Sequence, residues 1–141
     1  MDIRVDVELA CPIDAVLPLI SDLTQYPHWM GLVHAVVPES DSQAWQVELR
    51  GKIGPFARST RLRMVQVETS NAAHLRFERA EVDGRSHSAW VLEAKVSHQS
   101  SMTTLNMTLH YGGRLFSTVV ERALQDEIEA SKQRLRDLVA Q

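Results

Sequence analysis

Cysteine is nearly absent from this sequence. Cys11 is the only one among 141 residues, so an intrachain disulfide, a thiolate zinc cage and a Cys-x-x-Cys redox pair are all excluded. This cysteine usage fits a reducing compartment, and we expect a cytoplasmic protein.

Long hydrophobic runs are missing as well. No segment approaches the ~20 consecutive apolar residues that a membrane-spanning helix requires. The opening residues, Met1 to Asp6, lack the basic start and the apolar stretch of a signal peptide. We therefore expect no insertion into a membrane.

Neither sign of charge dominates. Lys and Arg number 15 against 18 Asp and Glu, which gives a formal net charge of −3. Nucleic-acid binding normally needs a net basic surface, so we expect no nucleic-acid partner. Hydrophobic residues make up 44% and charged residues 23% of the chain, an ordinary globular composition. The length predicts a single domain over residues 1–141.

Motifs for catalysis and metal binding are not found. Six histidines, at positions 28, 34, 74, 87, 98 and 110, form no His-x-His or His-x-x-x-His pair, and neither His-Glu-x-x-His nor Gly-x-Ser-x-Gly occurs. The segment Gly51 to Gly54 has neither the spacing of a dinucleotide fingerprint nor the ending of a P-loop. We assign no catalytic residue, no metal site and no cofactor.

Hydrophobic and polar residues alternate along much of the sequence. Ile3, Val5, Val7 and Leu9 alternate with charged residues and predict a strand with one buried face. After Pro12 the period changes, which predicts one or two short helices over residues 13–30. Alternation returns in six pieces, predicting an antiparallel meander of strands near 32–39, 43–50, 56–68, 73–82, 85–97 and 101–111.

The connectors and the C-terminal segment complete this pattern. Asp83-Gly84 is the clearest hairpin signal among the connectors. From Arg114 to about residue 139 the sequence predicts one long amphipathic helix, because Leu124, Ile128, Ser131 and Leu135 advance by steps of three or four.

This order of elements resembles the helix-grip fold of the START-like, Bet v 1-like superfamily, also called SRPBCC, which includes polyketide cyclase/dehydrase-type proteins. The most specific stretch runs from Pro12 to Trp29 and contains Ser21-Asp22-Leu23 and Tyr26-Pro27-His28-Trp29. The resemblance implies an α+β fold in which a curved antiparallel sheet of about seven strands wraps around the C-terminal helix. It also implies a cavity between the two for lipids, quinones, polyketides or other apolar molecules.

The alternation predicts which side chains face that cavity, since one parity of each strand points toward the helix. Polar groups of the same parity, Arg79, Glu81, Ser88 and Tyr111, are expected at one edge of the sheet, beside the start of the long helix. Trp90, Phe77 and Met107 fit a cavity lining and a filled core equally well. The expected ligand-binding set is Val47, Leu49, Leu62, Met64, Phe77, Arg79, Trp90, Leu92, Met107, Leu109, Tyr111, Phe116, Val119, Val120 and Ala123.

Three functions remain open from the residues alone. The first is a carrier, sensor or chaperone that binds a small hydrophobic or amphiphilic molecule. The second is a polyketide aromatase/cyclase or dehydratase-type enzyme that uses the polar groups at the sheet edge, although an acid/base pair is not evident. The third is a protein-interaction module, or a transient contact with a membrane surface, through the basic cluster Arg50, Lys52, Arg58, Arg61 and Arg63. No motif encodes the ligand, the oligomeric state or the pathway.

Overall fold

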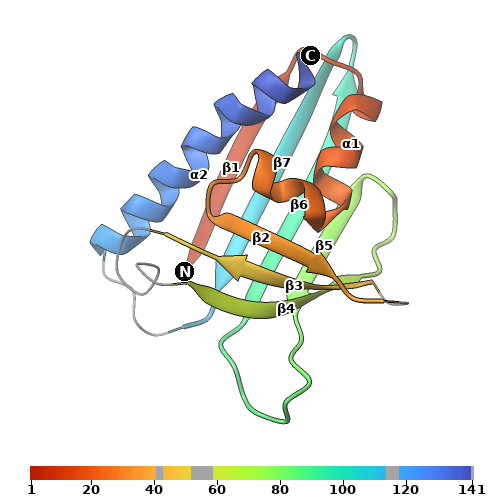
Figure 1. Cartoon of the computed structure of the whole chain (residues 1–141). Coiled ribbons are helices and arrows are strands. Elements are labelled where there is room, and N and C mark those ends of the chain that lie inside the picture. The colour runs from red at the N-terminus through yellow and green to blue at the C-terminus, as the bar shows by residue number, and fades with distance from the viewer. Residues whose placement is uncertain (41–42, 52–58, 114–117, 141) are drawn as a thin grey trace.

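The computed structural model describes residues 1–40, 43–51, 59–113 and 118–140 (Figure 1). Its strands build one antiparallel sheet, and its helices cover one face of that sheet. In chain order the elements are β1 (Asp2–Leu9), α1 (Ile13–Ser21), η1 (Leu23–His28, a 3-10 helix), β2 (Val33–Pro38), β3 (Ala44–Leu49), β4 (Thr60–Val67), β5 (His74–Arg79), β6 (Trp90–Gln99), β7 (Met102–Tyr111) and α2 (Thr118–Val139).

The sheet is a meander closed by its first strand. Its seven strands follow the order β1-β7-β6-β5-β4-β3-β2, so every neighbour from β2 to β7 is also a neighbour in sequence. The N-terminal strand β1 pairs antiparallel with β7, from Asp2 opposite His110 to Leu9 opposite Thr103. The predicted α+β helix-grip architecture is confirmed, with the strands in the predicted order.

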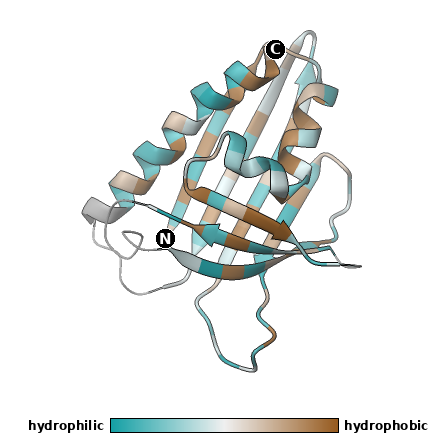
Figure 2. Ribbon diagram, in the orientation of Figure 1, coloured by the Kyte–Doolittle hydropathy of each residue, from teal (hydrophilic) through white to brown (hydrophobic). Residues whose placement is uncertain are grey.

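Alternation sorts the side chains between the two faces of the sheet. Along β1 the residues Ile3, Val5, Val7 and Leu9 are buried, and the residues between them are exposed. Figure 2 shows the same interleaving of hydrophobic and hydrophilic positions along the other strands. The buried parity of each strand faces the helices, because that is where apolar surface is removed from water.

Helix α2 covers the β1 side of the sheet (Figure 1). Its buried residues are those of the predicted apolar face, Leu124, Ile128, Ser131 and Leu135. Between this face, β1, β7 and the turn after η1, only about 10 Å³ admits the centre of a water molecule. The C-terminal part of α2 therefore closes a filled core. The predicted helix began at Arg114, and residues 114–117 lie outside the described residues.

The connection between β5 and β6 differs from the prediction. We expected strands over 73–82 and 85–97 joined tightly at Asp83-Gly84, but β5 ends at Arg79 and β6 begins at Trp90. Pairing between β5 and β6 ends at Glu78 opposite Val91. Beyond the end of β5, the Glu81 carboxylate turns to β4 and accepts the hydrogen bond of the Arg63 amide at 2.7 Å. Gly84 does take the left-handed backbone expected of a turn glycine, with φ of 73°.

A bulge in β2 changes the parity of that strand. Val33 pairs with Leu49, whereas Ala35 pairs with Glu48, so one residue is inserted between them. No helix in the described residues is long and apolar enough to span a membrane.

Candidate functional site

An apolar cavity lies on the helix-covered face of the sheet. It is bounded by strands β2, β3, β4, β6 and β7 on one side and by η1 with the following turn on the other. It lies at the end of the sheet where β4 begins and β7 ends. Its described lining consists of Leu23, Tyr26, Met30, Leu32, Val33, Val36, Val47, Leu49, Leu62, Met64, Trp90, Leu92 and Leu109.

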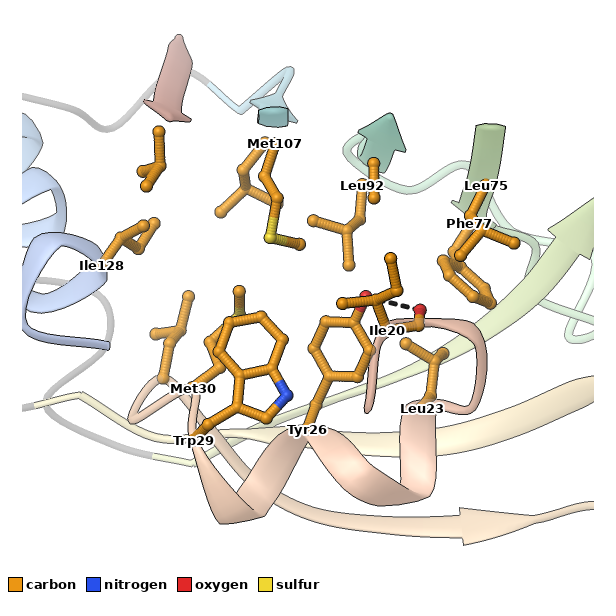
Figure 3. Packing of buried hydrophobic residues seen from close by; sticks show 14 of the residues in the cluster. Ile20, Leu23, Tyr26, Trp29, Met30, Leu75, Phe77, Leu92, Met107 and Ile128 are labelled. Carbon is orange, nitrogen blue, oxygen red and sulfur yellow. Dashed lines mark hydrogen bonds between the residues drawn. The ribbon is translucent and has the colours of Figure 1, made fainter. Parts of the chain in front are cut away.

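The 3-10 helix η1 forms the wall of the cavity opposite the sheet. Polar contacts hold this helix in place. The Asp22 carboxylate caps η1 by accepting the Thr24 amide at 3.0 Å. The Tyr26 hydroxyl donates to the Ile20 carbonyl at 2.8 Å, and the Trp29 indole N–H donates to the Leu19 carbonyl at 3.1 Å. Figure 3 shows both rings rising from η1 toward Leu92 and Met107 of the sheet.

The cavity is narrow and its lining is almost wholly apolar. Its volume is about 460 Å³ including the open mouth, of which only about 40 Å³ admits the centre of a water molecule. Tyr26 carries the one hydroxyl in the described lining, and that hydroxyl already donates to Ile20. Burial raises the pKa of Tyr26, so the phenol stays protonated. The surface that a ligand meets is therefore mainly hydrocarbon, aromatic ring and thioether.

Seven of the residues expected to bind a ligand line this cavity. They come from four different strands, as an inward-facing set should. They are Val47, Leu49, Leu62, Met64, Trp90, Leu92 and Leu109.

Two residues of the expected set lie in packed core instead. Phe77 is fully buried, with its ring edge-on to Trp45 at 5.6 Å and to Tyr26 at 6.4 Å between ring centroids. Met107 lies over the small space under α2, near Ile128. Alternation places both correctly on the inner face, but helical elements stand directly against them and leave no room for a ligand.

Apart from Arg79, the remaining expected residues are not part of the described lining or lie outside the described residues. Tyr111 is half-buried and its ring lies 4.5 Å from that of Trp90 between centroids. Ala123 is half-buried on α2. Phe116 lies outside the described residues, as do the side chains of Val119 and Val120 in the first turn of α2.

Sequence reasoning missed the part of the lining that precedes β3. The expected ligand-binding set contained no residue before Val47, but the described lining includes Leu23, Tyr26, Met30, Leu32, Val33 and Val36. The β2 bulge explains why Val33 and Val36 share a face despite their odd spacing. A hydrophobic run that fits neither a period of 2 nor 3.6 was the available signal.

Polar side chains gather where the sheet ends beside the cavity. Arg79 Nε lies 3.2 Å from Glu81 Oε1, and their side chains are 14% and 19% exposed. Arg79 also donates to the Ser88 carbonyl at 3.3 Å. Arg79 and Glu81 thus meet at this edge as predicted, whereas Ser88 takes part through its backbone carbonyl, and the ring of Tyr111 lies against Trp90.

One group of described residues has the donor atoms for a metal ion. Oxygen or nitrogen atoms of Glu81, Asp83 and His87 lie within 4.8 Å of one another. These atoms already bond to protein groups, since His87 Nε2 lies 2.8 Å from Asp83 and its Nδ1 faces Arg79 at 3.4 Å. The Arg85 backbone N–H, followed by His87, lowers the pKa of Asp83.

The basic cluster is largely neutralised where the structure describes it. Arg63 Nε lies 2.8 Å from Glu39, and Arg50 lies 3.6 Å from Glu48. Arg61 is exposed on the outer face. Lys52 and Arg58 lie outside the described residues. Two acidic residues that precede this basic run, Glu39 and Glu48, therefore pair with two of its arginines.

Comparison with known proteins places this architecture among relatives. A family model described as "Polyketide cyclase / dehydrase and lipid transport" matches residues 1–140. No curated protein sequence matches significantly. The fold, in contrast, has many solved counterparts.

Three of these structures show how far the likeness extends. A START superfamily protein from Mycobacterium smegmatis is 13% identical with a TM-score of 0.73, covering 99% of this chain and 97% of its own. A protein from Thermus thermophilus is 16% identical with a TM-score of 0.72 over the same shares. The Zhui aromatase/cyclase from a Streptomyces species is 13% identical with a TM-score of 0.68, covering 99% and 93%. With the family match spanning nearly every residue, the chain belongs to the polyketide cyclase/dehydrase and lipid transport family.

Proposed function

We propose that this protein binds a small hydrophobic or amphiphilic molecule in the cavity between η1 and the sheet, as a carrier, sensor or chaperone. The observation that carries this proposal is a cavity lined by apolar groups from six elements, next to a smaller space under α2 of which only about 10 Å³ admits the centre of a water molecule. Ligand pockets are typically apolar with few polar groups at their rim. The narrow shape favours a thin or planar hydrocarbon body.

Binding is favoured over catalysis by the chemistry of the lining. General acid-base catalysis needs a proton donor or acceptor within reach of the bound molecule. In the described lining the only such group is the Tyr26 hydroxyl, which is engaged with Ile20. Glu81 is held as an ion-pair partner of Arg79. A cyclase or dehydratase activity would have to rest on Arg79, Glu81, Ser88 and Tyr111 at the rim.

Filling the cavity tests the proposal directly. Val47→Phe adds a phenyl ring to the lining, whereas Val37→Phe makes the same change at an exposed position of β2. We expect naphthalene binding, followed by fluorescence, to be lost in the first variant and retained in the second, with Leu49→Phe as an independent repeat. Native mass spectrometry with organic extraction then identifies any molecule that copurifies. Equal binding by all four proteins would overturn the proposal.

A further inference from the structure

Arg79 stands on the same face of the sheet as the cavity lining. It follows Leu75 and Phe77 in the inner parity of β5 and is directly opposite Met64 of β4. Its guanidinium reaches across to the Ser88 carbonyl, two residues before Trp90. Met64 and Trp90 both line the cavity. Arg79 and its partner Glu81 therefore form a charged pair next to the end of the cavity.

Backbone groups on both sides hold this pair in place. Glu81 Oε1 accepts the Arg63 amide at 2.7 Å as well as Arg79 Nε at 3.2 Å. Arg79 is fixed by the Ser88 carbonyl and faces His87 Nδ1 at 3.4 Å. Because guanidinium only donates hydrogen bonds, His87 Nδ1 is the acceptor in that contact. The pair is therefore preorganised, which lowers the cost of binding a ligand group.

The pair still has capacity for one more polar group. A guanidinium carries five N–H donors, and Glu81, Ser88 and His87 use one each. Both hydrogen bonds to Glu81 reach Oε1, and within the described part of the chain Oε2 accepts none. Arg79 can thus donate a further hydrogen bond to a ligand, and Oε2 of the neighbouring Glu81 can accept one.

The opposite charges of the pair decide which group fits. A hydroxyl can accept from Arg79 and donate to Glu81 at the same time. A carboxylate would be repelled by Glu81, and a pure hydrocarbon would desolvate both ions without replacing their contacts with water. The pair thus favours a neutral hydroxyl over both alternatives.

We propose that Arg79 and Glu81 bind the hydroxyl group of a neutral phenol or alcohol whose hydrocarbon body occupies the cavity. This inference rests on the proposed function and specifies the ligand class for the same site. The Arg79–Glu81 pair sets specificity, and the apolar lining supplies the contact area.

Three probes of nearly equal size separate these ideas: 2-naphthol, 2-methylnaphthalene and 2-naphthoate, measured against the full chain by calorimetry at neutral pH. We expect 2-naphthol to bind about ten-fold or more tightly than either of the others, the range expected for a hydrogen bond to a charged group. Equal affinity for all three probes would overturn the inference and leave the proposed function standing. Failure of all three probes to bind would overturn the proposed function itself.

Variants of the pair provide a second test. Glu81→Gln keeps the shape but leaves Arg79 unbalanced, so 2-naphthoate should gain about ten-fold relative to 2-naphthol. Arg79→Met should abolish the preference for 2-naphthol while retaining 2-methylnaphthalene. Glu78→Gln is the matched control, because Glu78 pairs with Arg76 and alternates away from Arg79 on the same strand. An unchanged ratio of the 2-naphthol and 2-naphthoate affinities in Glu81→Gln would contradict the assignment, even if Arg79→Met fails to fold.

Discussion

The Gly31 amide donates a hydrogen bond to Ser131 Oγ across 3.3 Å, joining the segment before β2 to the middle of α2. Ser131 is fully buried and its hydroxyl donates in turn to the Glu127 carbonyl at 3.2 Å. This contact links the wall that carries Met30 and Leu32 to the helix that closes the core. One cavity wall is therefore tied to the helix over the neighbouring core by groups a hundred residues apart.

Ser131→Ala should lower the free energy of unfolding by about 1 kcal/mol, because the Gly31 amide loses its acceptor while alanine slightly favours the helix. Gly31→Ala is the informative comparison. A Cβ at Gly31 would lie 2.0 Å from Glu127 Oε1 and 2.7 Å from an Arg134 nitrogen. Both atoms end flexible side chains that can move aside, at the cost of one weak surface ion pair. Urea denaturation should therefore show a smaller effect for Gly31→Ala, and the reverse order would contradict this account.

Phe77→Ala should be among the most damaging substitutions in the chain. The ring is fully buried between Trp45 and Tyr26, so its removal leaves a cavity that rigid aromatic neighbours cannot fill. We expect a loss of about 3–5 kcal/mol, against less than about 1.5 kcal/mol for Phe77→Leu. Chemical denaturation measures both values. A small loss for Phe77→Ala would show that Phe77 belongs to the open cavity, as the sequence alone allowed.

Phe77 also illustrates how much could be predicted from the sequence. A period of two specifies which side chains of β3 to β7 face inward, and the structure buries nearly all of them. Alternation does not specify what stands opposite an inward side chain. Tyr26 faces Phe77 and excludes a ligand there, whereas Leu62 and Leu92 have open space before them. That difference depends on where η1 docks, which is a tertiary contact.

Two other departures arise from contacts between distant residues. The bulge of β2 brings Val33 and Val36 to one face, and the local sequence signals it only as a hydrophobic run that fits neither a period of 2 nor one of 3.6. A loop from Ala80 to Ala89 stands where a tight hairpin was expected, and within it Glu81 bonds to the Arg63 amide of β4, a partner distant in sequence. The sequence predicted that Arg79 and Glu81 lie together at this edge of the sheet. It did not predict that the Arg63 amide and the Ser88 carbonyl hold them in place.

Gly113→Ala should displace the aromatic residue at the cavity's edge. A Cβ at Gly113 would lie 1.9 Å from the Tyr111 hydroxyl and 2.3 Å from a ring carbon, and a rigid ring cannot yield as a flexible chain does. The ring must then shift from its place beside Trp90. We expect a loss of about 1–3 kcal/mol, as for other overpacked sites, with a changed near-ultraviolet circular dichroism spectrum.

Gly112→Ala is the matched control for that experiment. Its Cβ would meet the Ala89 Cβ at 3.3 Å, a contact that a few tenths of an ångström relieve. We expect less than about 1 kcal/mol and an unchanged aromatic spectrum, since no ring must move. Equal effects of the two substitutions would mean that backbone conformation, rather than the Tyr111 ring, explains the requirement for glycine.

Acid should remove the contribution of the Glu39–Arg63 pair. The hydrogen bond from Arg63, followed by that from Gln46, holds the pKa of Glu39 below its usual range. A carboxylate with a lowered folded-state pKa stabilises the fold fully above its unfolded value of about 4.3, and this stabilisation is lost as the pH falls through the folded value. Glu39→Gln should therefore be less stable than the parent at about pH 7, with the difference shrinking below about pH 4. Urea midpoints across this range measure the effect, with the exposed Glu68→Gln as control. A difference that stays constant with pH would show that Glu39 acts through packing instead of charge.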